Sequence, residues 1–239
     1  MSRTHILALG LLALATAPAF AADLPVKARP PMAPVETVWN WSGFYIGVNG
    51  GYGWARSEHV DVRGVTSGTF NQRGGLVGGT VGYNWQTGGA VLGLEADLDW
   101  AHINGSAVCG TLNVLSTCFT NMQAFGTVRG RLGYAAGSWM PYITGGLALA
   151  DLKVGQSIPG VVGNEDWRAG WTVGAGLEWM FAPSWSMKAE YLYADFGNSA
   201  ISYNGAPLTV SVSERNVNII RGGINYHFNW GGGPVMARY

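Results

Sequence analysis

The sequence predicts an all-β fold, an eight-stranded antiparallel up-and-down transmembrane β-barrel, and three observations favour it. Segments of about eleven residues alternate between apolar or aromatic positions and small or polar ones, which is the period of a β-strand. The connections between these segments are alternately short and long, as in outer-membrane barrels. Charged residues make up only 12% of the chain, roughly half the ~25% usual in soluble domains.

Residues 1–21 are typical of a secretory signal peptide. Arg3 supplies the basic start, residues 6–15 the apolar stretch, and Ala19-Phe20-Ala21 a small-residue cleavage site, so we expect cleavage between Ala21 and Ala22. The apolar run of about ten residues is shorter than the ~20 that a spanning helix needs. No later segment is apolar for 18 residues, so the sequence predicts no transmembrane helix.

The mature chain begins with a Pro-rich segment, 22–40, that carries four prolines in ten positions between Pro25 and Pro34 and has no apolar period. This composition is typical of an extended periplasmic linker. We expect the barrel to occupy 41–230 and a C-terminal tail to occupy 231–239.

The first four strands are predicted over 44–55, 75–86, 90–100 and 121–134, because one parity in each is mostly apolar and the other is small or polar. Their apolar faces carry, in chain order, Phe44, Ile46, Val48, Tyr52 and Trp54; Val77, Val81, Tyr83 and Trp85; Leu92, Leu94, Leu98 and Trp100; and Met122, Val128, Leu132 and Tyr134.

The last four strands are predicted over 141–154, 167–181, 185–196 and 214–228. In the first of these Asp151 and Lys153 share the apolar parity, and we place them beyond the apolar band. The apolar faces carry Ile143, Leu147 and Leu149; Trp171, Val173, Leu177, Trp179 and Phe181; Met187, Tyr191 and Tyr193; and Ile220, Ile224, Tyr226 and Phe228.

An even number of strands returns both chain ends to the side of the short turns, which is the periplasmic side of such barrels. Long connections are expected at about 56–73 and 101–120, and short ones at 87–89, 135–140 and 182–184. In hydrocarbon every backbone amide and carbonyl needs an internal partner, and a closed barrel leaves no open edge. The apolar face therefore meets lipid and the polar face meets the lumen.

The polar face carries the ionisable residues, and eight strands leave a lumen just wide enough to be filled by side chains. Such charges must pair with one another. We therefore expect a salt-bridged lumen with five acids and five bases, namely Glu95, Asp97, Asp99, Glu178 and Glu190 with Arg129, Arg131, Arg168, Lys188 and Arg221.

A tight turn at Ala182-Pro183-Ser184 that sets Phe181 opposite Trp185 places Glu178 directly across from Lys188. The two residues are therefore expected to be cross-strand neighbours. Glu95 is expected to face Arg129 or Arg131, although the connection at 101–120 is too long to fix that register.

Tryptophans are expected in two belts at the membrane interfaces. The short-turn ends carry Trp39, Trp41, Trp85, Trp139, Trp179, Trp185 and Trp230, and the long-loop ends carry Trp54, Trp100 and Trp167.

Other kinds of site have little support in the sequence. Cys109 and Cys118 are the only cysteines, and in an exported chain such a pair favours a disulfide over zinc. The histidines of the mature chain are His59, His102 and His227; the first two lie in or beside different long loops and the third at the opposite end. We therefore expect no enzyme activity, cofactor or metal. The formal net charge of zero argues against a nucleic-acid partner.

Several motifs resemble those of a known family. They are Ala21-Ala22-Asp23-Leu24-Pro25, then 41–53 (WSGFYIGVNGGYG), 141–148 (PYITGGLA) and 188–193 (KAEYLY). Across essentially the whole mature chain, the sequence resembles the small alphaproteobacterial outer-membrane β-barrel surface antigens, an OmpA-like or porin-type family. The resemblance implies an eight-stranded barrel that supports envelope integrity and is displayed at the cell surface, with no catalytic residues. Family members often end on an aromatic residue of the last strand, so Phe228 and Tyr239 are both candidates for the assembly signal.

The sequence thus predicts a structural, surface-exposed protein of the outer membrane of a Gram-negative bacterium. Two alternatives stay open: a narrow pore for ions or small solutes, and a barrel that captures a ligand or modifies lipid through its loops. Outer-membrane lipid and the barrel-assembly machinery are the expected partners, and contact with peptidoglycan or a host surface is left open.

Overall fold

The structure, a computed structural model, describes residues 39–61, 66–111, 114–156, 164–202 and 209–228. All of them lie within one compact unit, Thr37–Tyr239. The described part of the chain contains no helix with the length and apolarity needed to cross a bilayer.

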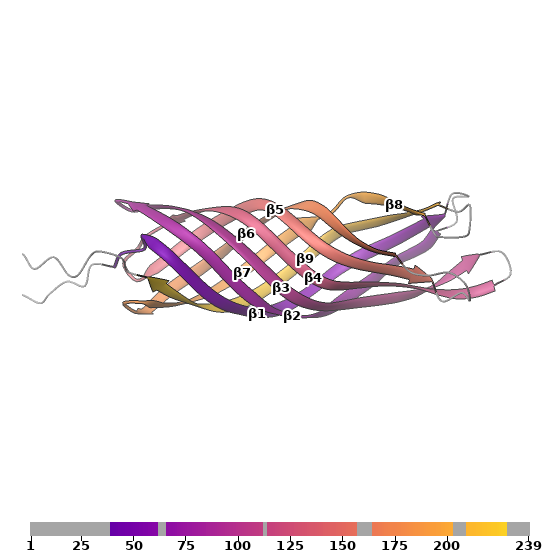
Figure 1. Cartoon of the computed structure of the whole chain (residues 1–239), viewed down its shortest axis with the longest axis horizontal. Coiled ribbons are helices and arrows are strands. Elements are labelled where there is room, and N and C mark those ends of the chain that lie inside the picture. Colours follow the sequence, from indigo (N-terminus) through magenta and orange to yellow (C-terminus); the bar gives the residue numbers. More distant parts are fainter. Residues whose placement is uncertain (1–38, 62–65, 112–113, 157–163, 203–208, 229–239) are drawn as a thin grey trace, which may run out of the picture. The chain divides into compact units, whose positions relative to one another are not determined.

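Antiparallel strands form one sheet that closes on itself, and they run obliquely around the barrel (Figure 1). The sheet follows chain order and closes because the first strand also pairs with the last. The strands are β1 (Gly43–Asp61), β2 (Thr66–Thr87), β3 (Ala90–Thr111), β4 (Val114–Tyr134), β5 (Trp139–Gln156), β6 (Asn164–Ala182), β7 (Trp185–Asp195), β8 (Asn198–Ser202) and β9 (Thr209–Phe228).

The barrel wall is eight strands around although nine strands are numbered, because β7 and β8 together form one interrupted strand. Both pair with β9, and the register continues unchanged from Ala194↔Val217 to Asn198↔Ser213. The interruption falls at Gly197, whose φ of +68° is left-handed and open to glycine without strain. The prediction of a closed eight-stranded antiparallel barrel is confirmed.

Most strands are longer than predicted, with 18 to 22 residues in β1 to β6 and in β9. The expected long loops at 56–73 and 101–120 are therefore wrong in large part, since β1 with β2 and β3 with β4 pair through most of these segments. Beyond the membrane the outward face need not be apolar, and the inward face carries apolar residues such as Phe70 and Ile103. The apolar-polar alternation that marks a strand in the sequence therefore fades, although the hydrogen-bonded ladder continues.

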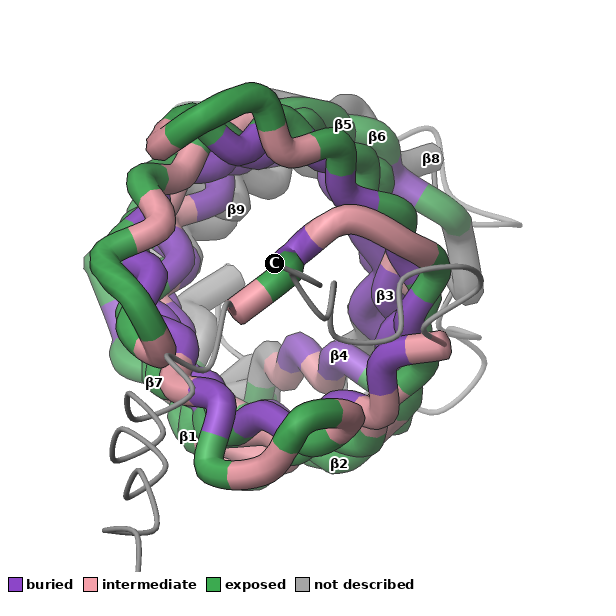
Figure 2. Tube along the Cα trace, turned by 90° about the vertical axis from the view of Figure 1, so that its left-hand side faces the viewer, coloured by how far each residue is buried: buried purple, intermediate pink, exposed green. Residues whose placement is uncertain are grey.

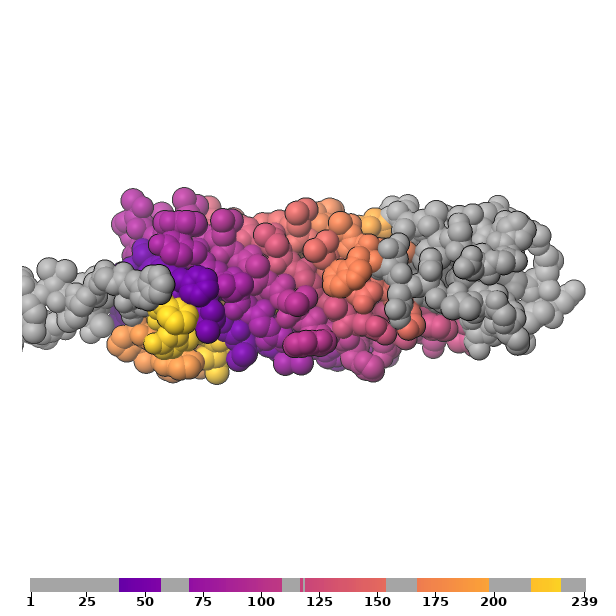
Figure 3. All heavy atoms as spheres, viewed as in Figure 1, coloured from indigo at the N-terminus to yellow at the C-terminus, as the bar shows by residue number. Residues whose placement is uncertain are grey.

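The outward apolar band keeps the thickness of a membrane. On β1 it runs from Phe44 to Trp54, both exposed, and the next outward residue is Arg56. Ten residue steps at about 3.3 Å, tilted by roughly 45°, span about 23 Å, close to the ~25 Å band of outer-membrane barrels. The space-filling view shows the close-packed side chains on one face of this exterior (Figure 3).

The tryptophan belts differ from expectation at Trp41. Trp85, Trp139 and Trp185 are exposed at the turn end, but Trp41 is fully buried in the lumen. Its amide donates to Gln86 Oε1 at 2.8 Å and its Nε1 to the Gly137 carbonyl at 3.2 Å. Figure 2 looks into this end, where the segment that leads into β1 crosses the opening. Trp230, predicted for the same belt, lies outside the described residues.

A bulge changes which residues of β4 face the lumen. The pairing of β4 with β5 shifts between Met122 and Ala124, so that Met122 is buried and Gln123 is exposed. The expectation that Met122 faces lipid and Gln123 the lumen was therefore wrong. A bulge inserts one residue and reverses the parity beyond it, which strict alternation does not anticipate.

Three short turns link strands at the turn end: two residues between β2 and β3, four (135–138) between β4 and β5, where Ala136 forms a bridge to Trp139, and two before β7. Gly88 and Gly137 take left-handed φ values of +60° and +64° in the first two. In the third, Ala182 pairs with Trp185, and a register shift follows between Met180 and Ala182. Phe181 is thus not opposite Trp185 as expected. The shift compensates, so that Glu178 still lies directly across from Lys188 as predicted.

Candidate functional site

The lumen is filled in three layers along the barrel. At the turn end five apolar side chains close it: Trp41, Val91, Met140, Tyr142 and Met180. A larger apolar layer lies toward the loop end and includes Ile103, Met122, Phe125, Leu192 and Ile219, each 1% exposed or less. The charged residues lie between these layers.

The charged layer is one connected set of ion pairs, here called the lumen charge network: Glu95, Asp97, Asp99, Arg129, Arg131, Glu178, Lys188, Glu190 and Arg221. Every side chain in these ion pairs is 1% exposed or less. Adjacent strands supply neighbouring members, since β3 and β4 pair Glu95 with Arg129 in register. Arg168, the tenth predicted lumen charge, is also buried and lies opposite Ala150, nearer the loop end.

Two arginines hold the middle of the network. Arg129 on β4 contacts Glu95, and its guanidinium lies 2.8 Å from Asp97 and 2.9 Å from Glu190 on β7. Arg221 on β9 lies 2.9 Å from Asp97, 3.0 Å from Asp99 and 2.8 Å from Glu190. These bonds run from one wall of the barrel to another, so they cross the lumen rather than line it.

Near the turn end the pairs differ from a simple cross-strand scheme. Glu178 and Lys188 are neighbours on β6 and β7, yet Arg131 contacts Glu178 at 2.6 Å and Lys188 contacts Glu95 at 2.9 Å. Because the side chains reach across a narrow interior, the β-ladder fixes adjacency but not the ion-pair partner.

Hydroxyl and aromatic side chains add hydrogen bonds and a cation–π contact to the polar layer. Thr80 and Thr127 each donate to Asp97 at 2.7 Å, and Tyr45 donates to Glu95 at 2.8 Å. The Arg131 guanidinium lies 4.0 Å from the ring centroid of Tyr142. Buried ion pairs are stable only where such hydrogen bonds satisfy the remaining lone pairs and protons.

Two glycines make room for the tyrosine rings. Tyr45 and Tyr142 lie over Gly82 and Gly176 of the adjoining strands, where an added Cβ would overlap the phenol. Glycine at these positions lets an aromatic ring cover the neighbouring backbone inside a narrow barrel.

A serine, a histidine and a glutamate meet in the lumen, a combination that the sequence reasoning missed. Ser186 Oγ lies 2.9 Å from His227 Nε2 and donates to Glu178 Oε1 at 2.5 Å. In a nucleophilic triad the hydroxyl gives its proton to the imidazole and the carboxylate orients the other ring nitrogen. Here the hydroxyl donates its hydrogen bond to the carboxylate instead, and all three side chains are buried. The arrangement therefore fits a structural hydrogen-bond cluster. Asn225 Nδ2 also donates to Glu178 Oε1, at 2.7 Å. The cue in the sequence was that Ser186 has the parity of Lys188 and Glu190, and Asn225 and His227 that of Arg221, so all of them face the lumen.

Some predicted residues lie partly or wholly outside the described side chains. Ala21, Ala22 and Tyr239 are in segments that are not described. The backbone pairs Cys109 with Ser116 and Cys118 with Ala107, which places the cysteines close together on adjoining strands. Their disulfide stays a prediction that thiol labelling of the unreduced protein checks. Phe228 is the last described residue, and its ring centroid lies 5.6 Å from that of Phe44 on β1.

Comparison with known proteins agrees with this architecture. A family model described as the outer membrane protein beta-barrel domain matches residues 7–228. The chain is 38% identical over 229 residues to the 31 kDa outer-membrane immunogenic protein of Brucella melitensis biotype 1, covering 88% of this chain and 93% of that protein. It is 29% identical over 188 residues to the 22 kDa outer membrane protein of Rhizobium leguminosarum bv. viciae, covering 78% and 79% of the two chains.

Two solved structures share the fold. The outer membrane protein OprG of Pseudomonas aeruginosa gives a TM-score of 0.50 at 14% identity, covering 78% of this chain and 97% of OprG. The outer membrane protease OmpT of Escherichia coli gives a TM-score of 0.51 at 8% identity, also covering 78% and 97%. At these identities the likeness concerns the barrel alone, and the Brucella relatives are named as immunogenic proteins rather than enzymes.

Proposed function

The chain belongs to the outer membrane protein β-barrel family, and from this premise we propose that it is a structural barrel that supports the envelope and does not conduct. One observation carries the proposal: the lumen charge network crosses the interior between two apolar layers. A conducting pore needs a continuous path of polar groups that water can wet. The buried apolar clusters with Ile103, Phe125 and Leu192 toward the loop end and Trp41 toward the turn end argue against such a path.

The network supports a structural role in a second way. Taking charges out of water is costly, and removing one partner of a buried pair leaves an uncompensated charge. Five barrel strands, β3, β4, β6, β7 and β9, contribute members, so the pairing is satisfied only when these strands stand in one register. The network therefore favours a single closed arrangement of the strands.

Single-channel recording of the refolded mature protein in a planar bilayer tests the proposal. A heat-dependent shift in gel mobility is the control for a folded barrel. We expect a folded barrel without steady openings, and a deletion strain with increased detergent sensitivity. Steady openings that disappear on neutralising Arg129 or Glu95 would show instead that the lumen conducts.

A further inference from the structure

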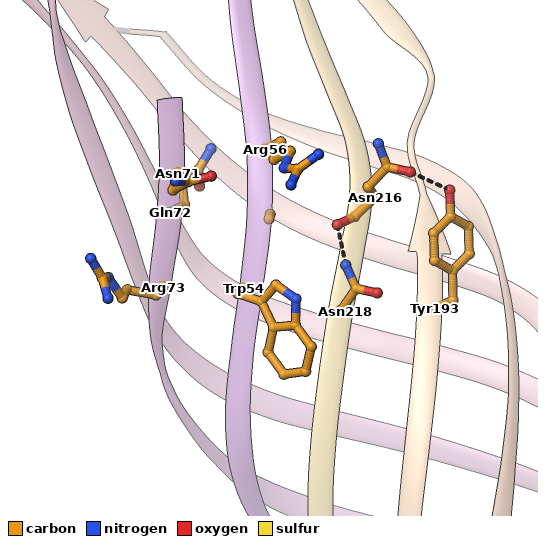
Figure 4. A pocket seen from close by; sticks show the side chains of 9 residues that line it. Trp54, Arg56, Asn71, Gln72, Arg73, Tyr193, Asn216 and Asn218 are labelled. Carbon is orange, nitrogen blue, oxygen red and sulfur yellow. Dashed lines mark hydrogen bonds between the residues drawn. The ribbon is translucent and has the colours of Figure 1, made fainter. Parts of the chain in front are cut away.

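A pocket of about 510 Å³ opens on the outside of the barrel, where the outward apolar band ends on the loop side. It spans β2, β1, β9 and β7, which lie side by side in that order (Figure 4). Its outward-facing residues are Trp54 and Arg56 on β1, Asn71 and Arg73 on β2, Asn216 and Asn218 on β9, and Tyr193 on β7. In such barrels the end opposite the short turns faces the outside of the cell, so the pocket lies at the level of the outer-leaflet headgroups.

Two cations in the pocket lie outside the ion pairs that the described side chains form. Arg56 and Arg73 are both exposed, and within the described ranges neither is part of an ion pair. The lumen charge network, by contrast, pairs its arginines repeatedly. Asp195 lies two residues beyond Tyr193, and its carboxylate accepts a hydrogen bond from the Gly197 amide at 2.8 Å. The pocket thus presents guanidinium groups that an external anion can pair with.

The floor of the pocket is held in place by hydrogen bonds. Asn216 has a φ of +59°, and among the described residues it is the only one other than glycine with a positive φ. It lies where the β1–β9 register shifts between Trp54 and Arg56, so the left-handed residue forms a bulge. Its Oδ1 accepts from the Tyr193 hydroxyl at 2.9 Å, and its carbonyl accepts from Asn218 Nδ2 at 2.6 Å. Local strain of this kind is often retained at binding sites.

The position of the pocket and the chemistry of its side chains together indicate the class of ligand that it binds. Guanidinium groups bind phosphate oxygens with paired hydrogen bonds, and asparagine amides suit sugar hydroxyls. Trp54 closes the membrane side of the pocket, and Tyr52 and Ile220 continue the apolar exterior beneath it, where acyl chains lie. The volume falls within the ~300–1,000 Å³ usual for a small-molecule site. We propose that this pocket binds the phosphate-bearing sugar headgroup of an outer-leaflet glycolipid. The proposal holds whether or not the lumen conducts.

Native mass spectrometry of the full-length mature protein in detergent tests the site, with a bisphosphorylated disaccharide lipid as the probe. We expect Arg56→Gln to lower its affinity about tenfold, and Arg56→Gln with Arg73→Gln to lower it further, as charge-assisted hydrogen bonds are lost. The matched control is Lys153→Gln, which removes one positive charge from the outward face of β5, away from the pocket. All variants are first checked for the heat-dependent mobility shift of a folded barrel.

The other arms identify the source of the phosphate. The dephosphorylated lipid should bind the wild type about as weakly as the phosphorylated lipid binds the double variant. Millimolar inorganic phosphate should not displace the lipid, because the acyl chains contribute to binding. Equal affinity of wild type and double variant, or an equal loss in Lys153→Gln, would overturn the site. Displacement by inorganic phosphate alone would overturn the glycolipid as its ligand.

Discussion

The variant that loses only Arg131 from the lumen charge network should be less stable than the variant that loses both Arg131 and its main partner, Glu178. Arg131 contacts Glu178 at 2.6 Å, and Glu178 is fully buried. At an effective dielectric constant of ~20, charges at this separation attract by about 6 kcal/mol, and desolvation offsets part of that. Replacing Arg131 by methionine leaves Glu178 buried without its cation, which should cost about 3–5 kcal/mol.

The double variant Arg131→Met with Glu178→Gln removes one charge of each sign and keeps the network balanced. We expect its loss to fall short of the sum of the single losses by at least ~2 kcal/mol, the coupling typical of contacting charges. Urea unfolding in phospholipid vesicles, followed by tryptophan fluorescence and gel mobility, measures each free energy. Arg73→Met, which removes an exposed arginine outside the lumen, is the control and should stay within about 0.5 kcal/mol of wild type. Additive losses, or single losses below ~1 kcal/mol, would refute the reasoning.

Two further pairs of substitutions, each a test variant with its control, examine particular features of the lumen by the same unfolding assay. Gly82→Ala should cost about 1–3 kcal/mol because the new Cβ overlaps the Tyr45 ring, whereas Gly50→Ala, with its nearest atom at 3.6 Å, should be nearly neutral; equal effects would contradict the ring placement. Met122→Asp buries an unpaired carboxylate and should prevent stable folding or cost more than ~3 kcal/mol, while Gln123→Asp should be tolerated; the reverse order would place the β4 bulge elsewhere.

Much of the barrel could be predicted from the sequence because a membrane makes alternation strict. Outward positions between the two interfaces must be apolar, so the strands and their order followed from parity and connection length. The Glu178–Lys188 adjacency was also correct, but only because a register shift compensates for the misplaced turn. Strand ends could not be predicted in the same way, since above the membrane neither face of β1 to β4 has to be apolar. The bulge at Gln123 was missed because one inserted residue leaves no mark on composition.

The charged residues of the lumen could be predicted from the sequence, but its apolar layers could not. Leu76, Ile103, Leu192 and Ile219 share the parity of the charged residues, so apolar side chains occupy both faces of the loop-side half of the barrel. Reading the apolar parity as the lipid side hides this inner layer. Likewise, Trp41 stands before the first strand, where parity assigns no face, and only the three-dimensional path shows it to enter the lumen.

The apolar layers on either side of the lumen charge network affect how strongly its charges interact. The paired side chains are 1% exposed or less, so bulk water screens them weakly, and each attraction is stronger and each unpaired charge more costly than at a wetted surface. Neutralising one member of the network should therefore weaken the barrel before it opens a path through it. A conductance measurement on such a variant has meaning only beside a measurement of folding. Silence in a folded variant would mean that Phe125 and its apolar neighbours close the lumen by themselves, and that the charges between the layers serve the register of the strands.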